Sequence, residues 1–271
     1  MHDEIAMGYT ERKLSDSAYL IQGDKNESMY LINGKNRSLL IDAGMEEESL
    51  KRFCERLTDK ETICVLTHGH FDHIGKCGEF SEVYLDRRDL DMYLKNSNGS
   101  MGPVENFVCK DVDEVKKMED FYDLGDRKIE TIPLPGHTPG SVIFLDPHDK
   151  AVYCGDAIGS GCGVLMVEGI GSLSLQEYRE GLAGAIERLE KAGVDESWSF
   201  YGGHDGQQYH SRTCSYNPLS LKLMKDMKIL CEKMIDNTAT IHESIRDGQF
   251  GRVKEIIGIE GNAELQLIIE E

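Results

Sequence analysis

The stretch Cys64-Val65-Leu66-Thr67-His68-Gly69-His70-Phe71-Asp72-His73 decides the fold expected of this chain. Its start, Ile63 to Leu66, predicts a short buried strand, because the run is apolar and bounded by polar residues. Three histidines and one aspartate follow within six residues. Side chains alternate along extended backbone, so His68 and His70 are expected on the same side. Gly69 is expected to let the backbone bend tightly between them.

This density of imidazole and carboxylate groups predicts a metal site. A histidine that stands alone is more often an ordinary core or surface residue than a ligand, but positions 68, 70, 72 and 73 all carry ligand types. Histidine and carboxylate together suit zinc, iron or manganese. The alternative is a solvated polar loop or a pH-sensing histidine cluster. That alternative does not explain why further ligand-type residues follow later predicted strands.

Three later segments carry such residues. His137 lies among two prolines and two glycines in the segment 135–140, which predicts a rigid turn that leaves the side chain little freedom to lose on binding. Asp156 follows the apolar run 151–154, and His204 follows the run 197–201. Functional groups at strand ends are typical of α/β proteins, so these residues are candidates for the same site.

Thr-His-Gly-His-Phe-Asp-His at positions 67–73 resembles the His-x-His-x-Asp-His signature of the metallo-β-lactamase superfamily. Pro-Gly-His-Thr-Pro-Gly-Ser at 135–141 resembles the second histidine motif of that superfamily. The resemblance covers about residues 15–210 well and the remainder weakly. It implies an α/β (α+β) fold, a four-layer αββα sandwich in which two facing mixed β-sheets carry helices on their outer sides. A metal centre would lie at one edge of the sheets.

The same resemblance implies a centre with two divalent ions, zinc first and iron or manganese as alternatives. The family pattern assigns seven ligands: to the first metal His68, His70 and His137, to the second Asp72, His73 and His204, and as a bridge Asp156. It also implies that Asp72 orients the nucleophile. In the family a turn similar to Asp42-Ala43-Gly44 lies beside the metal loop and supports it, and a simple turn role for Asp42 is the alternative.

The pattern along the chain predicts one domain over residues 1–271, with a core at about 15–210 and a C-terminal helical extension with a final strand at 211–271. Strands are expected at 18–21, 29–32, 38–41, 63–66, 83–85, 128–132, 142–145, 151–154 and 197–201. Helices are expected at 46–57, 86–95, 174–193 and 218–236. The tail from 238 predicts a short helix, a glycine-containing turn and a strand at 265–269.

Two further segments have less regular patterns. Residues 96–103 are rich in turn formers and predict a loop, and residues 105–124 form either a lid or wall over the site or a solvated surface excursion. The glycine-rich segment 158–173 predicts a flexible region near the site mouth. Cys162 within it is a candidate thiol near substrate, or alternatively a packing residue.

Charge and cysteine usage indicate the compartment and the partners. A net charge of −19 over 271 residues repels nucleic acid and anionic membranes at long range. No apolar run approaches the length of a membrane span, and the polar start Met1–Glu4 has no secretory pattern. The eight cysteines form no Cys-x-x-Cys pair. We therefore expect a cytoplasmic protein with a small-molecule substrate and no nucleic-acid or membrane partner; a homo-oligomer is compatible with the sequence.

Metal-assisted hydrolysis is the expected activity. The resemblance points to a glyoxalase II-like enzyme that uses a metal-bound hydroxide on a thioester, lactone or other activated ester. Gly-x-Ser-x-Gly is absent, which disfavours a serine hydrolase. One alternative is a mononuclear iron enzyme resembling persulfide dioxygenases, which use two histidines and one aspartate. Another is a metal-containing small-molecule binding protein without turnover. His73 and His204 favour the hydrolase.

Three residues that follow the last ligand motif are candidates for contact with substrate: Tyr209, His210 and Arg212. Arg212 is suited to hold a carboxylate through two parallel hydrogen bonds. An ordinary surface loop is the alternative for all three residues.

Overall fold

The first sheet of the protein has seven strands in the order β1-β2-β3-β4-β5-β6-β7. The structure is a computed structural model that describes residues 8–24, 26–100, 104–159, 163–167, 171–204, 219–248 and 251–270. Strands β1 to β4 pair antiparallel, and β4 to β7 pair parallel, so the sheet is mixed. In chain order the strands span Tyr9–Lys13, Ala18–Gly23, Ser28–Asn33, Ser38–Ile41, Thr62–Val65, Val83–Leu85 and Lys116–Lys117.

The second sheet has five strands in the order β13-β11-β10-β9-β8. It is also mixed, because β11 and β13 pair parallel while the other neighbours pair antiparallel. In chain order its strands span Phe121–Asp123 (β8), Lys128–Pro133 (β9), Val142–Asp146 (β10), Ala151–Tyr153 (β11) and Ser199–Tyr201 (β13). Apart from β8, each of these strands overlaps a strand that the sequence predicts.

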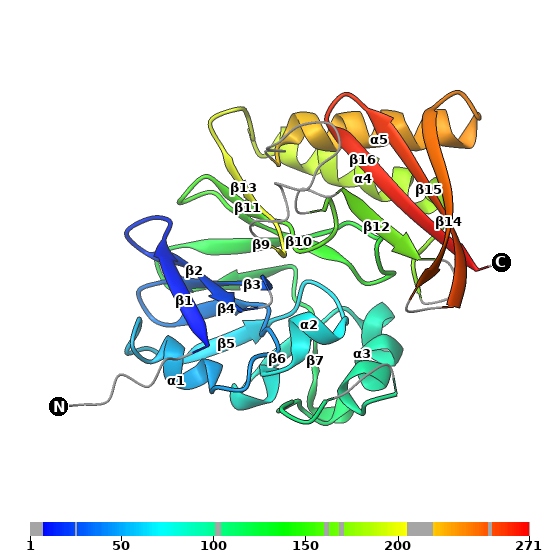
Figure 1. The fold of residues 1–271 in the computed structure, drawn as a ribbon. Coiled ribbons are helices and arrows are strands. Elements are labelled where there is room, and N and C mark those ends of the chain that lie inside the picture. Colours follow the sequence, from blue (N-terminus) through cyan, green and yellow to red (C-terminus); the bar gives the residue numbers. More distant parts are fainter. Residues whose placement is uncertain are drawn as a thin grey trace.

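The two sheets face each other across a buried core that includes Ile32, Val65, Phe144 and Tyr153. The helices α1 (Leu50–Cys54), α2 (Phe71–Ile74) and α3 (Leu90–Ser97) lie on one outer side of the pair of sheets (Figure 1). The helices α4 (Leu175–Lys191) and α5 (Leu221–Ile235) lie on the other outer side. This arrangement confirms the predicted four-layer αββα sandwich.

Local signals set the ends of the helices. Ser174 and Glu177 form the predicted capping box at the start of α4. The Asp86 side chain accepts a hydrogen bond from the Arg88 N–H group, as a helix cap does, ahead of the 3₁₀ turn η2 (Arg87–Asp89) that leads into α3. α1 is shorter than the predicted helix at 46–57, because it begins only after its own cap, Ser49.

A third sheet, in the order β12-β16-β15-β14, was not predicted. Its strands span Val164–Val167 (β12), Thr240–Gly248 (β14), Gly251–Glu260 (β15) and Ala263–Glu270 (β16). The short helix expected after residue 238 is therefore wrong, since β14 and β15 form a hairpin there. The strand at 265–269 is confirmed within β16, and the expected glycine-containing turn lies directly before it at Gly261 and Asn262. Ile241 and Ile245 have helical spacing but also lie on one face of a strand, and pairing with β15 decides between the two.

Two irregular segments of the sequence also have a defined structure. The glycine-rich segment 158–173 contains β12, which pairs parallel with β16, so this part of it is regular sheet. In the insertion at 105–124, the Val108 N–H group donates to Gly75 O at 2.7 Å, and Gly78 N–H donates to Val108 O at 2.6 Å. The insertion therefore supports the chain that follows α2 and then supplies β7 and β8. No helix of the described residues is long and apolar enough to cross a bilayer.

Candidate metal centre

The structure brings all seven predicted ligands together, from the ends of four strands and from the short helix α2. His68 and His70 follow β5, and α2 carries Asp72 and His73. The other three follow strands of the second sheet: His137 after β9, Asp156 after β11 and His204 after β13. They form three overlapping groups in which the ligand atoms lie within 4.8 Å of one another: His68, His70 and His137; His68, His73 and Asp156; and Asp72, His73 and His204.

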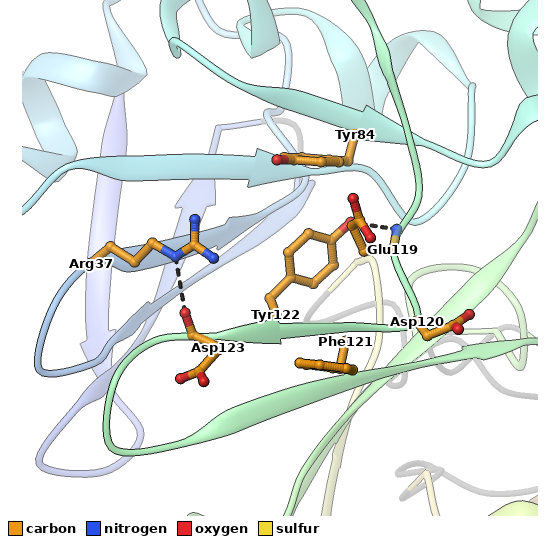
Figure 2. A pocket seen from close by; sticks show the side chains of 7 residues that line it. All are labelled: Arg37, Tyr84, Glu119, Asp120, Phe121, Tyr122 and Asp123. Carbon is orange, nitrogen blue, oxygen red and sulfur yellow. Dashed lines mark hydrogen bonds between the residues drawn. The ribbon is translucent and has the colours of Figure 1, made fainter.

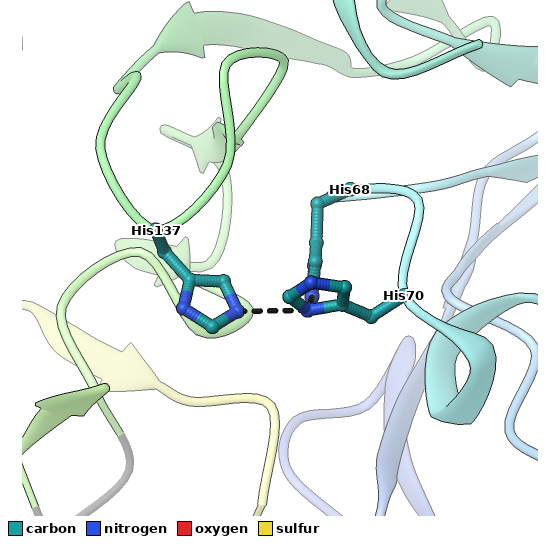
Figure 3. Close-up of side chains that lie close together, drawn as sticks. All are labelled: His68, His70 and His137. Carbon is teal, nitrogen blue, oxygen red and sulfur yellow. Dashed lines mark hydrogen bonds between the residues drawn. The ribbon is translucent and has the colours of Figure 1, made fainter. Parts of the chain in front are cut away.

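Three imidazoles form the first half of the site (Figure 3). His70 Nδ1 lies 3.0 Å from His68 Nε2 and 3.0 Å from His137 Nε2. Nitrogen ligands about 2.0–2.1 Å from a tetrahedral zinc ion lie about 3.3 Å apart, so the observed separations are close to those of a ligand set. The three side chains come from the loop after β5 and from the turn between β9 and β10.

Hydrogen bonds on the far side of two rings fix which nitrogen faces the centre. His137 Nδ1 lies 2.6 Å from the main-chain oxygen of Leu165 in β12, and this bond leaves Nε2 directed at His70. His68 Nδ1 lies 3.0 Å from Thr67 Oγ1, which leaves its Nε2 directed at the centre. Partners of this kind orient metal-binding histidines in general. The sequence did not predict the role of the Leu165 carbonyl, because this residue lies in the segment expected to be flexible.

Carboxylates and imidazoles alternate in the second half of the site. His204 Nε2 lies 3.3 Å from Asp72 Oδ2 and 3.4 Å from Asp156 Oδ2. His73 Nε2 lies 3.7 Å from Asp156 Oδ2, and so does His137 Nε2. Asp156 thus lies between the two halves, where a bridging group would be.

Electrostatics differ between the halves. Burial, followed by the charge of neighbouring imidazoles, lowers the pKa of His68 well below its ordinary value and that of His70 to about 3, so both rings are neutral. Burial opposes the ionisation of Asp72, but His73 and His204 outweigh it and hold its pKa at about 2. Burial likewise opposes a charge on His204, yet Asp156 and Asp72 raise its pKa to about 10. Neutral imidazole and ionised carboxylate are the forms that bind metal, so His68, His70 and Asp72 are already in the binding form, whereas His204 must lose a proton when an ion binds.

Two buried polar atoms at the centre indicate that a cation fits. His73 Nε2 and Asp156 Oδ1 are shielded from solvent, and neither has a hydrogen-bond partner among the described residues. Buried polar groups of folded proteins are almost always hydrogen-bonded, so a buried nitrogen and a buried oxygen without hydrogen bonds on two residues of one cluster call for a ligand. Gly203 lies so close that a Cβ atom there would overlap Asp156 and approach His73 Cε1 within 2.8 Å.

Asp42 occupies the supporting position that the resemblance implied. It is buried, and its carboxylate accepts hydrogen bonds from Thr67 N–H at 2.7 Å and Thr67 Oγ1 at 2.8 Å. Its Oδ2 also lies 2.9 Å from His73 Nδ1. The first two bonds fix the start of the ligand loop, and the third turns His73 Nε2 toward the centre. Asp42 is more than a turn residue, although its φ of 62° also places it in a left-handed turn.

We expect Asp42→Asn to weaken metal binding by about 10–100-fold, the usual cost of losing a partner behind a ligand. Asparagine tolerates the left-handed backbone, so the substitution isolates the lost acceptor. Competition with a chromophoric chelator measures the affinity. Asp126→Asn is the matched control, since Asp126 is exposed, accepts a bond from Lys35 N–H and precedes β9, whereas His137 follows the other end of that strand. Equal affinities of the two variants would contradict this role.

The candidate substrate residues Tyr209, His210 and Arg212 lie outside the described residues, as does Cys162. Their proposed contacts therefore stay predictions. Each of the seven predicted ligands, in contrast, lies within the described part of the chain.

A separate cavity of about 310 Å³ lies between β6 and β8 (Figure 2). None of its lining residues belongs to the ligand set. Its groups already have partners within the chain: Lys116 Nζ lies 5.5 Å from the centre of the Tyr84 ring, Lys128 Nζ lies 4.5 Å from that of Phe121, and Arg37 Nε donates to Asp123 O at 3.0 Å. The histidine and aspartate cluster is the stronger candidate site.

Comparisons with known proteins agree with this geometry. The family model described as "Metallo-beta-lactamase superfamily" matches residues 23–204. An acyl-coenzyme A thioesterase, MBLAC2, of Gallus gallus is 23% identical over 220 residues, which cover 69% of this chain and 78% of the relative. Hydroxyacylglutathione hydrolase GloC of Haemophilus influenzae is 27% identical over 153 residues, which cover 51% of this chain and 68% of the relative.

Solved structures show the same fold. A metallo-beta-lactamase from Pontibacter korlensis superposes with a TM-score of 0.59 at 17% identity, and the match covers 83% of this chain and 99% of that one. TTHA1623 in a di-iron-bound form superposes with a TM-score of 0.53 at 24% identity, covering 76% of this chain and 95% of that one. With the family match over 23–204 and the ligand cluster within it, the chain belongs to the metallo-beta-lactamase superfamily.

Proposed function

We propose that this protein is a metal-dependent hydrolase of thioesters or related activated esters. The observation that carries the proposal is the convergence of the seven ligand-type side chains, in which a buried nitrogen of His73 and a buried oxygen of Asp156 have no hydrogen-bond partner among the described residues. Membership of a superfamily whose matched relatives include hydrolases supports the reaction class.

Two divalent ions, zinc before iron or manganese, are proposed to bind in the two halves of the site. His68, His70 and His137 would hold the first, and Asp72, His73 and His204 the second, with Asp156 between them. Bound ions of this kind supply Lewis acidity and acidify a water molecule toward neutral pH. Asp72, whose side chain is 21% exposed, would accept a hydrogen bond from that water and orient it toward the substrate carbonyl.

The thioester assignment comes from two relatives, one named acyl-coenzyme A thioesterase and one named hydroxyacylglutathione hydrolase. Lactones and other activated esters present the same kind of carbonyl and remain in the proposed substrate class. A reducing cytoplasm is proposed as the compartment, since the described cysteines Cys54, Cys64, Cys77, Cys109, Cys154 and Cys231 are free thiols. The proposed partner is the small-molecule substrate.

The test combines metal analysis with a thioester panel. Protein prepared with and without oxygen is analysed for bound metals, stripped with a chelator and refilled with zinc, manganese or iron. Hydrolysis of acyl-coenzyme A and acylglutathione thioesters is then followed by loss of thioester absorbance. We expect about two ions per chain and a rate that disappears on stripping and returns on refilling.

Three results would contradict the proposal. A single iron ion with turnover that consumes oxygen would indicate an oxygenase. Tight metal binding with no rate above that of stripped protein, across thioesters, lactones and esters, would indicate a binding protein. Failure to take up any metal would remove the assigned role of the segment from His68 to His73.

A further inference from the structure

We propose that Asp89 is a positioning residue that fixes the two histidine ligand loops relative to each other. The proposal rests on the proposed function, because it concerns the same metal centre. Asp89 lies in the 3₁₀ turn η2, outside every ligand motif, and its carboxylate binds main-chain and hydroxyl groups beside the ligands rather than the ligand side chains.

The Asp89 carboxylate joins loops that are far apart in sequence. Its Oδ2 accepts hydrogen bonds from Gly69 N–H at 3.0 Å and from Thr138 Oγ1 at 2.7 Å, and its Oδ1 accepts one from Gly140 N–H at 2.6 Å. Gly69 lies between His68 and His70, and Thr138 directly follows His137. A single side chain thus holds the first loop against the second.

Asn96 in α3 completes the hold on the first loop. Its Nδ2 donates to Gly69 O at 3.0 Å and to Met92 O at 3.0 Å. Both polar main-chain groups of Gly69 are therefore bound by residues of η2 and α3. Rotation of the backbone at Gly69 would change the 3.0 Å separation of His68 Nε2 and His70 Nδ1. The hydrogen bonds from Asp89 and Asn96 to Gly69 therefore set the spacing of these two atoms.

Close packing against Asp89 explains why positions 69 and 140 are glycines. Neither Gly69 nor Gly140 has a positive φ, so the left-handed conformation that favours glycine is not the reason. A Cβ atom at Gly140 would lie 2.6 Å from Asp89 Cγ, and one at Gly69 would lie 3.0 Å from Asp89 O. The glycine of the first motif, expected to serve a tight bend, instead allows the chain to approach Asp89.

Because Asp89 is buried, these three hydrogen bonds take the place of the water molecules that would otherwise solvate its carboxylate. The residue is 0% exposed, and all three groups that bind its carboxylate are donors. An asparagine at this position has one acceptor oxygen and an amide that can only donate. In either orientation the amide would face an N–H or O–H donor, which leaves a buried group without a partner.

The first experiment measures metal binding without turnover. We expect Asp89→Asn to bind zinc about 10–100-fold more weakly in competition with a chromophoric chelator, the cost of losing a partner behind a ligand. We also expect an altered absorption spectrum after substitution with cobalt, because the ligand spacing changes. The matched control is Asp123→Asn, because Asp123 is exposed and its side chain also accepts from a main-chain N–H group, that of Gly125. Its affinity and spectrum should match the parent protein.

A hydroxyl series at Thr138 provides the second test. Thr138→Ser keeps the O–H group that donates to Asp89 and should retain parental affinity and spectrum, whereas Thr138→Val loses it and should weaken zinc binding about tenfold. If the Asp89→Asn protein is less stable but has parental zinc affinity and cobalt spectrum, Asp89 is merely structural and the proposal fails. Should that variant not fold, equal zinc affinity of the Thr138→Ser and Thr138→Val proteins overturns the proposal.

The tests of Asp89 can fail or succeed independently of the test of the proposed hydrolase activity. A parent protein that binds zinc but hydrolyses no ester contradicts the hydrolase and leaves the affinity comparison intact. In an active parent, we expect Asp89→Asn to lower kcat at saturating zinc and to change KM less, because the side chain does not contact substrate.

Discussion

Asp156→Asn is expected to weaken binding of divalent metal by more than about 100-fold and to remove hydrolysis with it. Loss of an outer partner of a ligand costs about 10–100-fold, and Asp156 is itself the proposed bridge. Its Oδ2 lies 3.4 Å from His204 Nε2 and 3.7 Å from both His73 and His137. The substitution keeps the size of the side chain but replaces one anionic acceptor with a donor, so both halves of the site lose charge compensation.

The measurement is metal content after dialysis, followed by chelator competition and thioester hydrolysis at saturating zinc. Asp59→Asn is the control for the same chemical change at an exposed position. A circular dichroism spectrum like that of the parent separates loss of metal from loss of fold. An Asp156→Asn protein that retains two ions and parental activity would contradict the bridging role and the assignment of the second sheet to the site.

The cluster of proposed ligands could be predicted because each of its members belongs to a short local motif. His68 to His73 follow the apolar run 63–66, Asp156 follows the apolar run 151–154 and His204 follows the run 197–201, and these runs located the residues at strand ends. Asp42 could be identified only through the family resemblance, since an aspartate before Ala-Gly is common in turns. That the ends of these strands meet at one edge also came from the resemblance rather than from the pattern.

Asp89 and Asn96 could not be predicted, because nothing in their local sequence marks them. The segment after β6 predicts a capped amphipathic helix, in which an aspartate or asparagine has ordinary surface roles. Their function depends on Gly69 and on Thr138 and Gly140, which lie 20 and about 50 positions away from Asp89. Contacts at that range are set by the packing of η2 and α3 against the loops, and hydrophobic periodicity does not encode them.

The third sheet was not predicted for a related reason, because it also depends on contacts between residues far apart in sequence. β12 is only four residues long and lies in a glycine-rich segment, so its pairing with β16 depends on chain about 100 residues later. This unpredicted strand nevertheless bears on the site, because its Leu165 carbonyl orients His137. The C-terminal strands therefore support the proposed metal centre through β12, although they contribute none of its seven proposed ligands.

The second large effect is expected on stability, at the end of β9 that is remote from His137. The Arg127 side chain is 1% exposed and pairs with Asp146, which is fully buried, and with Asp149 at 2.8 Å. Its Nη1 also donates to Ser17 Oγ at 2.5 Å, which joins the turn between β1 and β2 to the second sheet. This network ties the two sheets together.

Arg127→Met is expected to lower the free energy of unfolding by about 3–5 kcal/mol at neutral pH, because removing one partner leaves a buried charge uncompensated. Burial raises the pKa of Asp146 above its ordinary value even with Arg127 present, so the charged form is the costly one in the folded state. That cost exists above the ordinary pKa of about 3.8 and falls as acid protonates the carboxylate. The deficit of the variant should therefore shrink as the pH is lowered from 7 toward 4.

Urea unfolding at several pH values measures this deficit. Lys13→Met is the control, because Lys13 and Asp16 form an exposed pair at 2.9 Å whose loss should leave the free energy of unfolding nearly unchanged. A double variant, Arg127→Met with Asp146→Asn, should recover part of the loss, since it removes the buried charge as well. If Arg127→Met is no more destabilising than Lys13→Met, the pair does not hold the sheets together. The zinc affinity of folded Arg127→Met protein should equal that of the parent, because the Arg127 network contacts none of the proposed metal ligands. A variant with lower stability but unchanged zinc affinity would show that the network stabilises the sandwich without shaping the metal site.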